Sequence, residues 1–350
     1  MPFPPSWPEY IPKDKLANWF ESYADAMELN VWTGCEFNGA TYDTENGQWS
    51  AQMRLSDGRK VTLNPKHIVL ATSVSSIPKL PEIPTIENFR GKVIHASKYV
   101  GGKEYKGKSA FVFGTGTSGH DIAQDLASQG ADATLVQRGS TMIINVEPGA
   151  QLPYSLYREG LALEDCDLIT VATPFPVVRE AHKTFTKIAR EQDKELLDGL
   201  KARGMQLDFG IDDTGWQFKY LSRGGGYYFN VGASELVADG TVKLLQYSDI
   251  EKFVSTGVEQ KNGSTLKADI IILATGYEGM NAMVKKFFGD DVEERIGPIW
   301  GFDDDGLELR NMFCRTAQTG LWFMGGSFAQ CRIYSKYMAL QIKAEVEGLL

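Results

Sequence analysis

The sequence predicts an α/β fold that contains two dinucleotide-binding units, and two observations carry this prediction. The first is a G-x-G-x-x-G motif at Gly114, Gly116 and Gly119, placed between a β-rich apolar run and a helix-compatible run. The second is a repeated strand pattern, because residues 67–73 and residues 269–276 each place an apolar run directly before Ala-Thr. Two such strands indicate the ends of two separate units.

The chain begins with a Pro-rich stretch and a predicted helix. The apolar residues Leu16, Phe20, Tyr23 and Met27 recur at helical spacing, which predicts one buried face. Two alternating runs follow and are joined by the Ser-Asp-Gly sequence at residues 56–58. Asp-Gly between alternating runs predicts a β-hairpin.

The glycine motif lies inside a βαβ pattern. A β-rich run at residues 110–113 precedes it, a helix-compatible run at 120–128 follows it, and a second apolar run occupies 133–137. This context distinguishes a phosphate-binding turn from a chance G-x-G-x-x-G. The helix N-terminus is therefore expected to present its free N–H groups to a pyrophosphate.

Each glycine of the motif has its own physical reason. Gly114 allows the tight bend from strand to helix, and Gly116 removes the Cβ that would keep a pyrophosphate away. Gly119 lets the helix pack closely on the strand. The expected pyrophosphate-binding residues are Gly114, Thr115, Gly116, Thr117, Ser118 and Gly119.

The end of the second βαβ strand predicts which nicotinamide cofactor binds. An acidic residue there would accept a hydrogen bond from the ribose 2′-hydroxyl of NADH, but this chain has Arg138 followed by Ser140. A guanidinium with a neighbouring hydroxyl suits a 2′-phosphate, so we expect NADPH. The alternative is that Arg138 is a solvated charge at a strand end.

Length, charge and cysteine usage limit the class of protein. The 350 residues allow two domains, and a hydrophobic content of 43% is enough for their cores. The net charge is −9, and the sequence has no long run of like-charged residues, so nothing favours binding to nucleic acid or to an anionic membrane. The four cysteines form no C-x-x-C pair, and the four histidines lack ligand spacing. We expect a cytoplasmic protein without a metal site or a membrane span.

Two further motifs carry a resemblance to a known family. Phe89, Gly91, His95 and Tyr99 follow the pattern F-x-G-x-x-x-H-x-x-x-Y, which resembles the fingerprint of the flavin-containing monooxygenases. The sister Baeyer–Villiger enzymes have Trp at the last position, so Tyr99 favours the first branch. The Ala-Thr-Gly-Tyr sequence at residues 274–277 resembles the second diagnostic motif of the family. The resemblance extends over nearly the whole chain.

The resemblance implies a monooxygenase that uses FAD, NADPH and dioxygen. It implies that NADPH reduces FAD and that a flavin C4a-hydroperoxide then oxygenates a soft nitrogen or sulfur nucleophile, or an α-keto acid as in the plant auxin-forming relatives. The alternatives are a Baeyer–Villiger-type oxygenase and an inactive NADP-binding remnant that lacks FAD. The expected partners are a small-molecule substrate and dioxygen, and a homo-oligomer is compatible with the sequence.

The resemblance also implies that the NADPH domain is inserted into the FAD domain. We expect a first FAD-domain segment at residues 1–104, the NADPH domain with a helical insert at 105–266, and the return segment of the FAD domain at 267–350. No G-x-G-x-x-G precedes the first Ala-Thr strand, so we expect an N-terminally incomplete FAD domain that lacks its first βαβ unit. The remaining cofactor-binding residues implied are Thr72, Ala274, Thr275, Gly276, Tyr277, Gly325 and Gly326.

Three residues of these motifs have expected roles of their own. His95 and Tyr99 are expected to hold the junction between domains, and direct catalysis by His95 is the alternative. Ser73 stands where the family usually has Gly after Ala-Thr. If the backbone there needs a positive φ, Ser will tolerate it less well than Gly. No acid–base pair emerges from the insert, which fits chemistry carried by a flavin.

Overall fold

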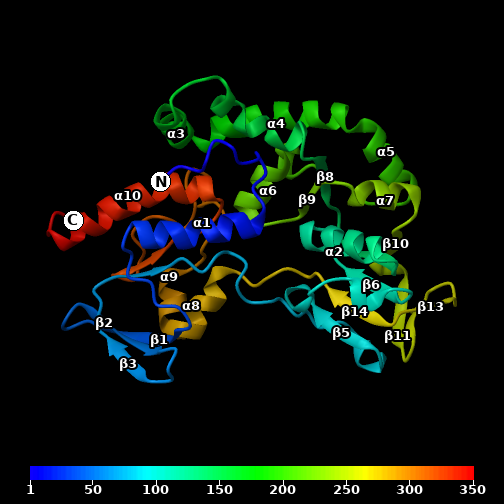
Figure 1. The fold of residues 1–350 in the computed structure, drawn as a ribbon, viewed down its shortest axis with the longest axis horizontal. Helices are drawn as coiled ribbons and strands as arrows, with labels where there is room; N and C mark the ends of the chain where they lie inside the picture. The colour runs from blue at the N-terminus through cyan, green and yellow to red at the C-terminus, as the bar shows by residue number, and fades with distance from the viewer. The chain divides into compact units, whose positions relative to one another are not determined.

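The computed structural model describes residues 1–350 and divides the chain into two compact units, Met1–Ile68 and Val69–Leu350 (Figure 1). The first unit consists of one helix and a three-stranded antiparallel sheet in the order β1-β2-β3. The Ser-Asp-Gly turn joins β2 to β3, so the predicted hairpin is confirmed. The elements are α1 (Lys13–Ala26), β1 (Glu36–Asp43), β2 (Gln48–Arg54) and β3 (Lys60–Leu63).

The predicted buried face of α1 is wrong, because the helix contains no buried residue. Phe20 is 43% exposed and Met27 is 53% exposed. The aromatic side chains of α1 contact one another instead, with the rings of Trp19 and Tyr23 stacked at 5.2 Å. Helical spacing predicted the helix correctly, but spacing alone does not supply a surface for the helix to cover.

A five-stranded parallel sheet is the centre of the second unit, with the strand order β10-β7-β6-β14-β5. Its first βαβ crossover runs from β6 through α2 to β7 and contains the glycine motif, as predicted (Figure 1). The elements are β5 (Lys92–His95), β6 (Ser109–Phe113), α2 (Thr117–Ser128), β7 (Asp132–Gln137), β10 (Lys243–Gln246) and β14 (Ile270–Leu273).

Side chains that alternate along β6 form the two cores of this sheet. Ala110 and Val112 pack on one face with residues of α2, α5 (Lys194–Ala202) and α7 (Ala233–Asp239). Phe111 and Phe113 pack on the other face, which the antiparallel sheet β11-β12-β13 covers. The three strands of that cover are β11 (Ile250–Val254), β12 (Gly257–Gln260) and β13 (Thr265–Lys267).

The two copies of the repeated strand pattern belong to different sheets. β4 (Ile68–Leu70) pairs with β15 (Leu321–Phe323), whereas β14 lies between β6 and β5. The five-stranded sheet therefore takes strands from all three expected domain ranges. In particular, β14 pairs with the strand of the glycine motif, although we expected it in the FAD return segment.

The remaining elements are an insert and a C-terminal segment. The insert holds a parallel strand pair and several helices: β8 (Met142–Asn145), η4 (Gly149–Arg158), α3 (Leu163–Ala172), α4 (Phe175–Gln192), η5 (Ile211–Asp213), α6 (Gly215–Arg223) and β9 (Tyr227–Asn230). The C-terminal segment adds α8 (Met280–Phe288), α9 (Asp290–Ile296) and α10 (Phe328–Val346). Short 3₁₀ turns are η1 (Ile86–Asn88), η2 (Ala96–Lys98), η3 (Lys103–Tyr105) and η6 (Tyr247–Asp249). No helix combines the length and apolar character that crossing a membrane requires.

Candidate cofactor-binding site

The glycine turn leaves one open face. A Cβ at Gly114 would lie 2.3 Å from the carbonyl oxygen of Ala274, and one at Gly119 would lie 2.0 Å from that of Gly114. Gly114 also has a φ of +121°. At Gly116, by contrast, the nearest atom to an added Cβ is the Tyr227 carbonyl oxygen at 3.8 Å. Packing within the chain therefore requires glycine at two positions, while Gly116 is partly exposed and a Cβ there would make only an ordinary van der Waals contact.

The hydroxyl groups around the turn have different surroundings. The Oγ1 of Thr115 is buried and lies 2.6 Å from the Oγ1 of Thr141, so this side chain is bound within the protein. The Oγ1 of Thr117 donates to the carbonyl of Tyr227 over 3.2 Å. Ser118 is exposed in the first turn of α2, whose N-cap makes no side-chain hydrogen bond. The first-turn N–H groups of α2 are thus available to an anion.

The end of β7 presents an unpaired cation. Gln137 is buried, and its Oε1 accepts hydrogen bonds from the N–H of Gln206 at 2.8 Å and the Nε2 of Gln246 at 2.9 Å. The next residue, Arg138, is exposed, and its guanidinium forms no hydrogen bond or ion pair with another residue. Ser140 is also exposed, and its hydroxyl donates to the carboxylate of Asp208.

His95 connects the fingerprint to the Ala-Thr-Gly-Tyr motif. Its Nδ1 accepts the N–H of Ser97 at 3.1 Å, so the proton resides on Nε2. Nε2 then donates to the carbonyl of Gly276 at 3.0 Å, and the ring meets that of Tyr277 edge to face. Both ring nitrogens of His95 are bound and its side chain is only 6% exposed, so the residue joins β5 to the Ala-Thr-Gly-Tyr motif.

Tyr99 connects the same fingerprint to α2. Its hydroxyl donates to the Oδ2 of Asp125 at 2.6 Å, and the N–H of Gly102 donates to the same oxygen at 2.7 Å. Burial, followed by the contact with the Asp125 carboxylate, raises the pKa of Tyr99 far above its ordinary value. The phenol therefore remains a neutral hydrogen-bond donor. Nothing in the sequence motif itself pointed to Asp125 as its partner.

The Ala-Thr-Gly-Tyr motif runs antiparallel to residues 77–79. The N–H of Lys79 donates to the carbonyl of Gly276 at 3.0 Å, and the N–H of Glu278 donates to that of Ile77 at 2.8 Å. The Oγ1 of Thr275 donates to the Lys79 carbonyl at 2.6 Å. The hydroxyl of Thr275 is therefore bound to the chain itself.

Ser73, which stands where the resembling family usually has Gly, has a left-handed backbone conformation. Its φ is +69°, and the corresponding Gly276 of the second copy has a φ of +81°. Thr72, just before it, offers its carbonyl to the hydroxyl of Ser76. The expectation that this position suits glycine is confirmed by the backbone, and Ser73 adopts the conformation at an energetic cost.

Gly325 and Gly326 follow β15 and precede α10. At Gly325 the nearest atom to an added Cβ is 3.7 Å away, whereas at Gly326 it would lie 2.4 Å from the Oε1 of Gln330. Ser327 and Gln330 form a capping box, which uses two of the free donors at the start of α10. Fewer free N–H groups are therefore left at the start of α10 for an anion.

The expected cofactor residues form two groups in the second unit. The glycine turn, His95 and the Ala-Thr-Gly-Tyr motif are in contact through Ala274 and Gly276. Gly325 instead lies against Val74, just after Thr72 and β4. This division separates the expected residues on the five-stranded sheet from those beside the β4–β15 pair.

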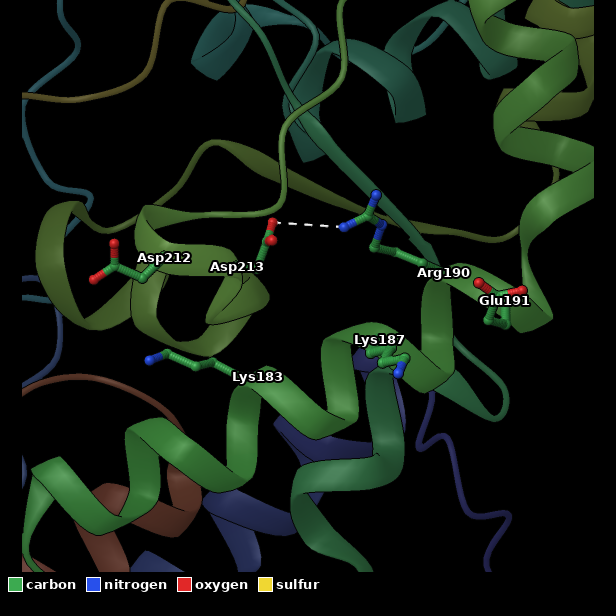
Figure 2. Close-up of a pocket in the computed structure, with 6 residues that line it drawn as sticks. All are labelled: Lys183, Lys187, Arg190, Glu191, Asp212 and Asp213. Carbon is green, nitrogen blue, oxygen red and sulfur yellow. Dashed lines mark ion pairs between the residues drawn. The ribbon is translucent and has the colours of Figure 1, made fainter.

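A separate cavity of about 410 Å³ lies between α4 and η5. Its lining residues are Lys183, Lys187, Arg190, Glu191, Asp212 and Asp213. Figure 2 shows the side chains of Lys183 and Lys187 on α4, and the pairing of Arg190 with Asp213, whose closest atoms are 3.6 Å apart. Cations and anions are equal in number there, and none of the expected cofactor residues lines it.

Comparisons with known proteins agree with the dinucleotide-binding class that the fold and the glycine turn define. The model of the flavin-binding monooxygenase-like family matches residues 1–159. A probable indole-3-pyruvate monooxygenase of Arabidopsis thaliana, YUCCA8, is 28% identical over 79% of this chain and 61% of its own length. Another from the same plant, YUCCA3, is 29% identical over 83% of this chain and 63% of its own length.

Solved structures show the same fold. Cyclohexanone monooxygenase from Rhodococcus sp. Phi1 bound to NADP+ has a TM-score of 0.60 and 17% identity, covering 96% of this chain and 70% of that one. A flavin monooxygenase from Stenotrophomonas maltophilia has a TM-score of 0.59 and 14% identity, covering 97% and 81%. The predicted α/β class with Rossmann-like domains is confirmed.

This chain is similar to the flavin-containing monooxygenases, through the family model over residues 1–159 and through these relatives. It spans between 61% and 63% of the length of the curated relatives described above.

Proposed function

We propose that this protein is an FAD- and NADPH-dependent monooxygenase. The observation that carries the proposal is the open face at Gly116 beside the uncapped start of α2, together with the unpaired guanidinium of Arg138 at the end of β7. N–H groups at a helix N-terminus bind a pyrophosphate, and a guanidinium binds a 2′-phosphate. This arrangement therefore fits NADPH.

The residues available to FAD are those beside the β4–β15 pair. Gly325 has no atom closer than 3.7 Å to an added Cβ, and the backbone at Ser73 turns with a positive φ next to it. These positions allow close approach of a flavin or its pyrophosphate. When bound, FAD would accept reducing equivalents from NADPH and activate dioxygen. The chain's own residues would bind and orient the two nucleotides and keep water out.

The proposed substrates follow from the branch to which the fingerprint points. Tyr99 favours a soft nitrogen or sulfur nucleophile, or an α-keto acid, and the plant relatives are named for an α-keto acid, indole-3-pyruvate. The second candidate is oxygen insertion into a ketone, which the fold match to cyclohexanone monooxygenase supports. We further propose that the protein works in the cytoplasm with its substrate and dioxygen as partners.

The test is to purify the whole protein and record its visible absorbance, its NADPH oxidation and its products. We offer indole-3-pyruvate, a tertiary amine, a thioether and cyclohexanone in separate reactions. The expected result is a flavin spectrum, faster NADPH oxidation with one of the first three compounds, and its oxygenated or decarboxylated product. A lactone from cyclohexanone would instead support the ketone oxygenase. A protein with neither flavin nor NADPH oxidation would be a remnant without this activity.

A further inference from the structure

A carboxylate that the βαβ pattern did not predict lies beside the end of β7. The N–H of Asp208 donates to the carbonyl of Thr141 at 3.3 Å, and the N–H of Thr141 donates to that of Gln206 at 3.1 Å. Leu207 and Thr141 form a parallel bridge. The hydroxyl of Ser140 donates to the Asp208 carboxylate. Residues 206–208 therefore extend along the segment that follows Arg138, and they bring an acid to it.

Asp208 forms an ion pair with a buried lysine. Lys219, on α6, pairs with the Oδ1 of Asp208, and the side chain of Lys219 is only 4% exposed. The N–H of Gly210 also donates to this Oδ1 at 3.0 Å. Burial pushes the pKa of Asp208 upward, but the hydrogen bonds from Lys219, Gly210 and Ser140 leave it below its ordinary value. Asp208 is therefore ionised at neutral pH.

The residues that follow Asp208 make contacts that restrain the loop. Arg190 places its guanidinium 4.1 Å from the centre of the Phe209 ring. The same guanidinium pairs with Asp213 (Figure 2). Gly210 has a φ of +86°, and an added Cβ there would lie 3.0 Å from the N atom of Gly215. These contacts restrain the backbone directly after Asp208.

This carboxylate has opposite effects on the two nicotinamide cofactors. An ionised acid near the adenosine ribose accepts a hydrogen bond from a 2′-hydroxyl, and it repels a 2′-phosphate. Arg138 acts in the opposite sense. The electrostatic potential at the 2′ position therefore depends on whether a neighbouring cation balances the negative charge of Asp208.

We propose that Lys219 neutralises Asp208 and in this way makes the site prefer a 2′-phosphate over a 2′-hydroxyl. Lys219 and Asp208 are positioning and specificity-determining residues in this scheme. The inference rests on the proposed NADPH site at Arg138.

The test measures nucleotide binding by titration calorimetry on the full chain, and it needs no turnover. The two probes are adenosine 2′,5′-bisphosphate and adenosine 5′-monophosphate, which differ only at the 2′ position. Lys219→Met should weaken binding of the bisphosphate about tenfold, because it leaves an uncompensated charge beside the phosphate. Binding of the monophosphate should stay unchanged or improve slightly.

Three further variants complete the experiment. Asp208→Asn should strengthen bisphosphate binding several-fold, and Asp208→Asn combined with Lys219→Met should return it to the wild-type value. Lys243→Met is the matched control, because Lys243 pairs with Asp132 at the opposite end of β7, over 2.7 Å. It should change neither affinity. If Lys219→Met alone fails to fold, Asp208→Asn and the double variant still measure the effect of the charge.

Two results would overturn the inference. One is an equal change, or no change, in the two affinities when Lys219 or Asp208 is replaced. The other is a double variant that binds the bisphosphate as weakly as Lys219→Met. If the wild-type chain binds neither probe, the proposed NADPH site itself is wrong, and the assignment of Lys219 falls with it.

Discussion

The phenol of Tyr99 and the carboxylate of Asp125 share a 2.6 Å hydrogen bond. Asp125 lies on α2, the helix whose N-terminus begins at the glycine turn, while Tyr99 follows β5 at the edge of the same sheet. The last residue of the fingerprint therefore fixes the helix that would face the pyrophosphate.

Tyr99→Phe should lower the free energy of unfolding by about 1–2 kcal/mol, because it removes a donor to an ionised acceptor. Urea denaturation measures this change. Tyr247→Phe is the control, since the Tyr247 ring packs on Phe113 and its hydroxyl has no hydrogen-bond partner. Equal stabilities of the two variants would show that the contact with Asp125 contributes nothing.

Gly91 of the fingerprint is required by packing. A Cβ there would lie 2.3 Å from the Cζ of Phe89 and 2.7 Å from the carbonyl oxygen of Asp269. Gly91→Ala should therefore destabilise the protein by about 2–3 kcal/mol, in the range of an overpacked core. Gly225→Ala meets no atom within 4 Å and should cost less than about 1 kcal/mol. Thermal unfolding of both variants decides the point, and an unaffected Gly91→Ala would contradict it.

His120 should make stability depend on pH. It is fully buried, its Nδ1 donates to the Gly116 carbonyl at 3.3 Å, and its Nε2 has no partner. Burial lowers the pKa of His120 to about 4. Below pH 6.5 the unfolded chain takes up a proton that the folded chain refuses, so stability falls as the pH falls from about 6.5 to about 4.

The loss attributable to His120 is about 2 kcal/mol between pH 7.5 and pH 5. Urea denaturation at both pH values should show a smaller difference for His120→Gln than for the wild type. His182 is also buried with a pKa lowered to about 4, so part of the dependence should remain in that variant. Identical pH dependence in the wild type and His120→Gln would contradict the assignment.

Ser73 and Gly276 provide a reciprocal test of backbone strain. Both have a positive φ, and nothing lies within 4 Å of a Cβ built at Gly276. Ser73→Gly should raise the free energy of unfolding by about 0.5 kcal/mol, and Gly276→Ser should lower it by about 1 kcal/mol. Thermal melts of the two variants should therefore shift in opposite directions. A destabilised Ser73→Gly would mean that the serine side chain compensates for the strain.

Arg138 should discriminate between the two nicotinamide cofactors. Loss of a charge-assisted contact with the 2′-phosphate costs about 1.5–3 kcal/mol, so Arg138→Ala should weaken NADPH binding roughly ten- to a hundredfold. NADH binding should hardly change. Arg90→Ala removes another exposed arginine, two residues before β5, and serves as the control. Equal losses of NADPH and NADH would show that Arg138 does not contact the 2′-phosphate.

Local rules predicted the parts of the fold in which sequence neighbours are also spatial neighbours. The βαβ unit and the hairpin at residues 56–58 both follow from residues a few positions apart. Gly114 and Gly119 also have the close contacts that the motif requires. Each of these features depends on backbone geometry, which the glycine and turn positions in the sequence reveal directly.

Contacts between distant segments could not be predicted in the same way. Asp208 reaches the end of β7 only because residues 206–208 pair beside Thr141, and no spacing in the sequence encodes that pairing. The place of β14 in the five-stranded sheet was equally hidden, since its apolar run fits either nucleotide-binding unit. The capping box of α10, by contrast, follows from the local spacing of Ser327 and Gln330.

The antiparallel pairing of residues 77–79 with residues 275–278 has a mechanical consequence. The chain passes between the β4–β15 pair and the five-stranded sheet along both segments, and hydrogen bonds at Lys79, Thr275 and Glu278 join them. Because the two segments are hydrogen-bonded along their length, they bend together as one two-stranded ribbon. Such a ribbon flexes easily across its flat face and resists shear within its plane. A relative movement of the β4–β15 pair and the five-stranded sheet would therefore bend both segments together, and His95 bonds to one of them at Gly276.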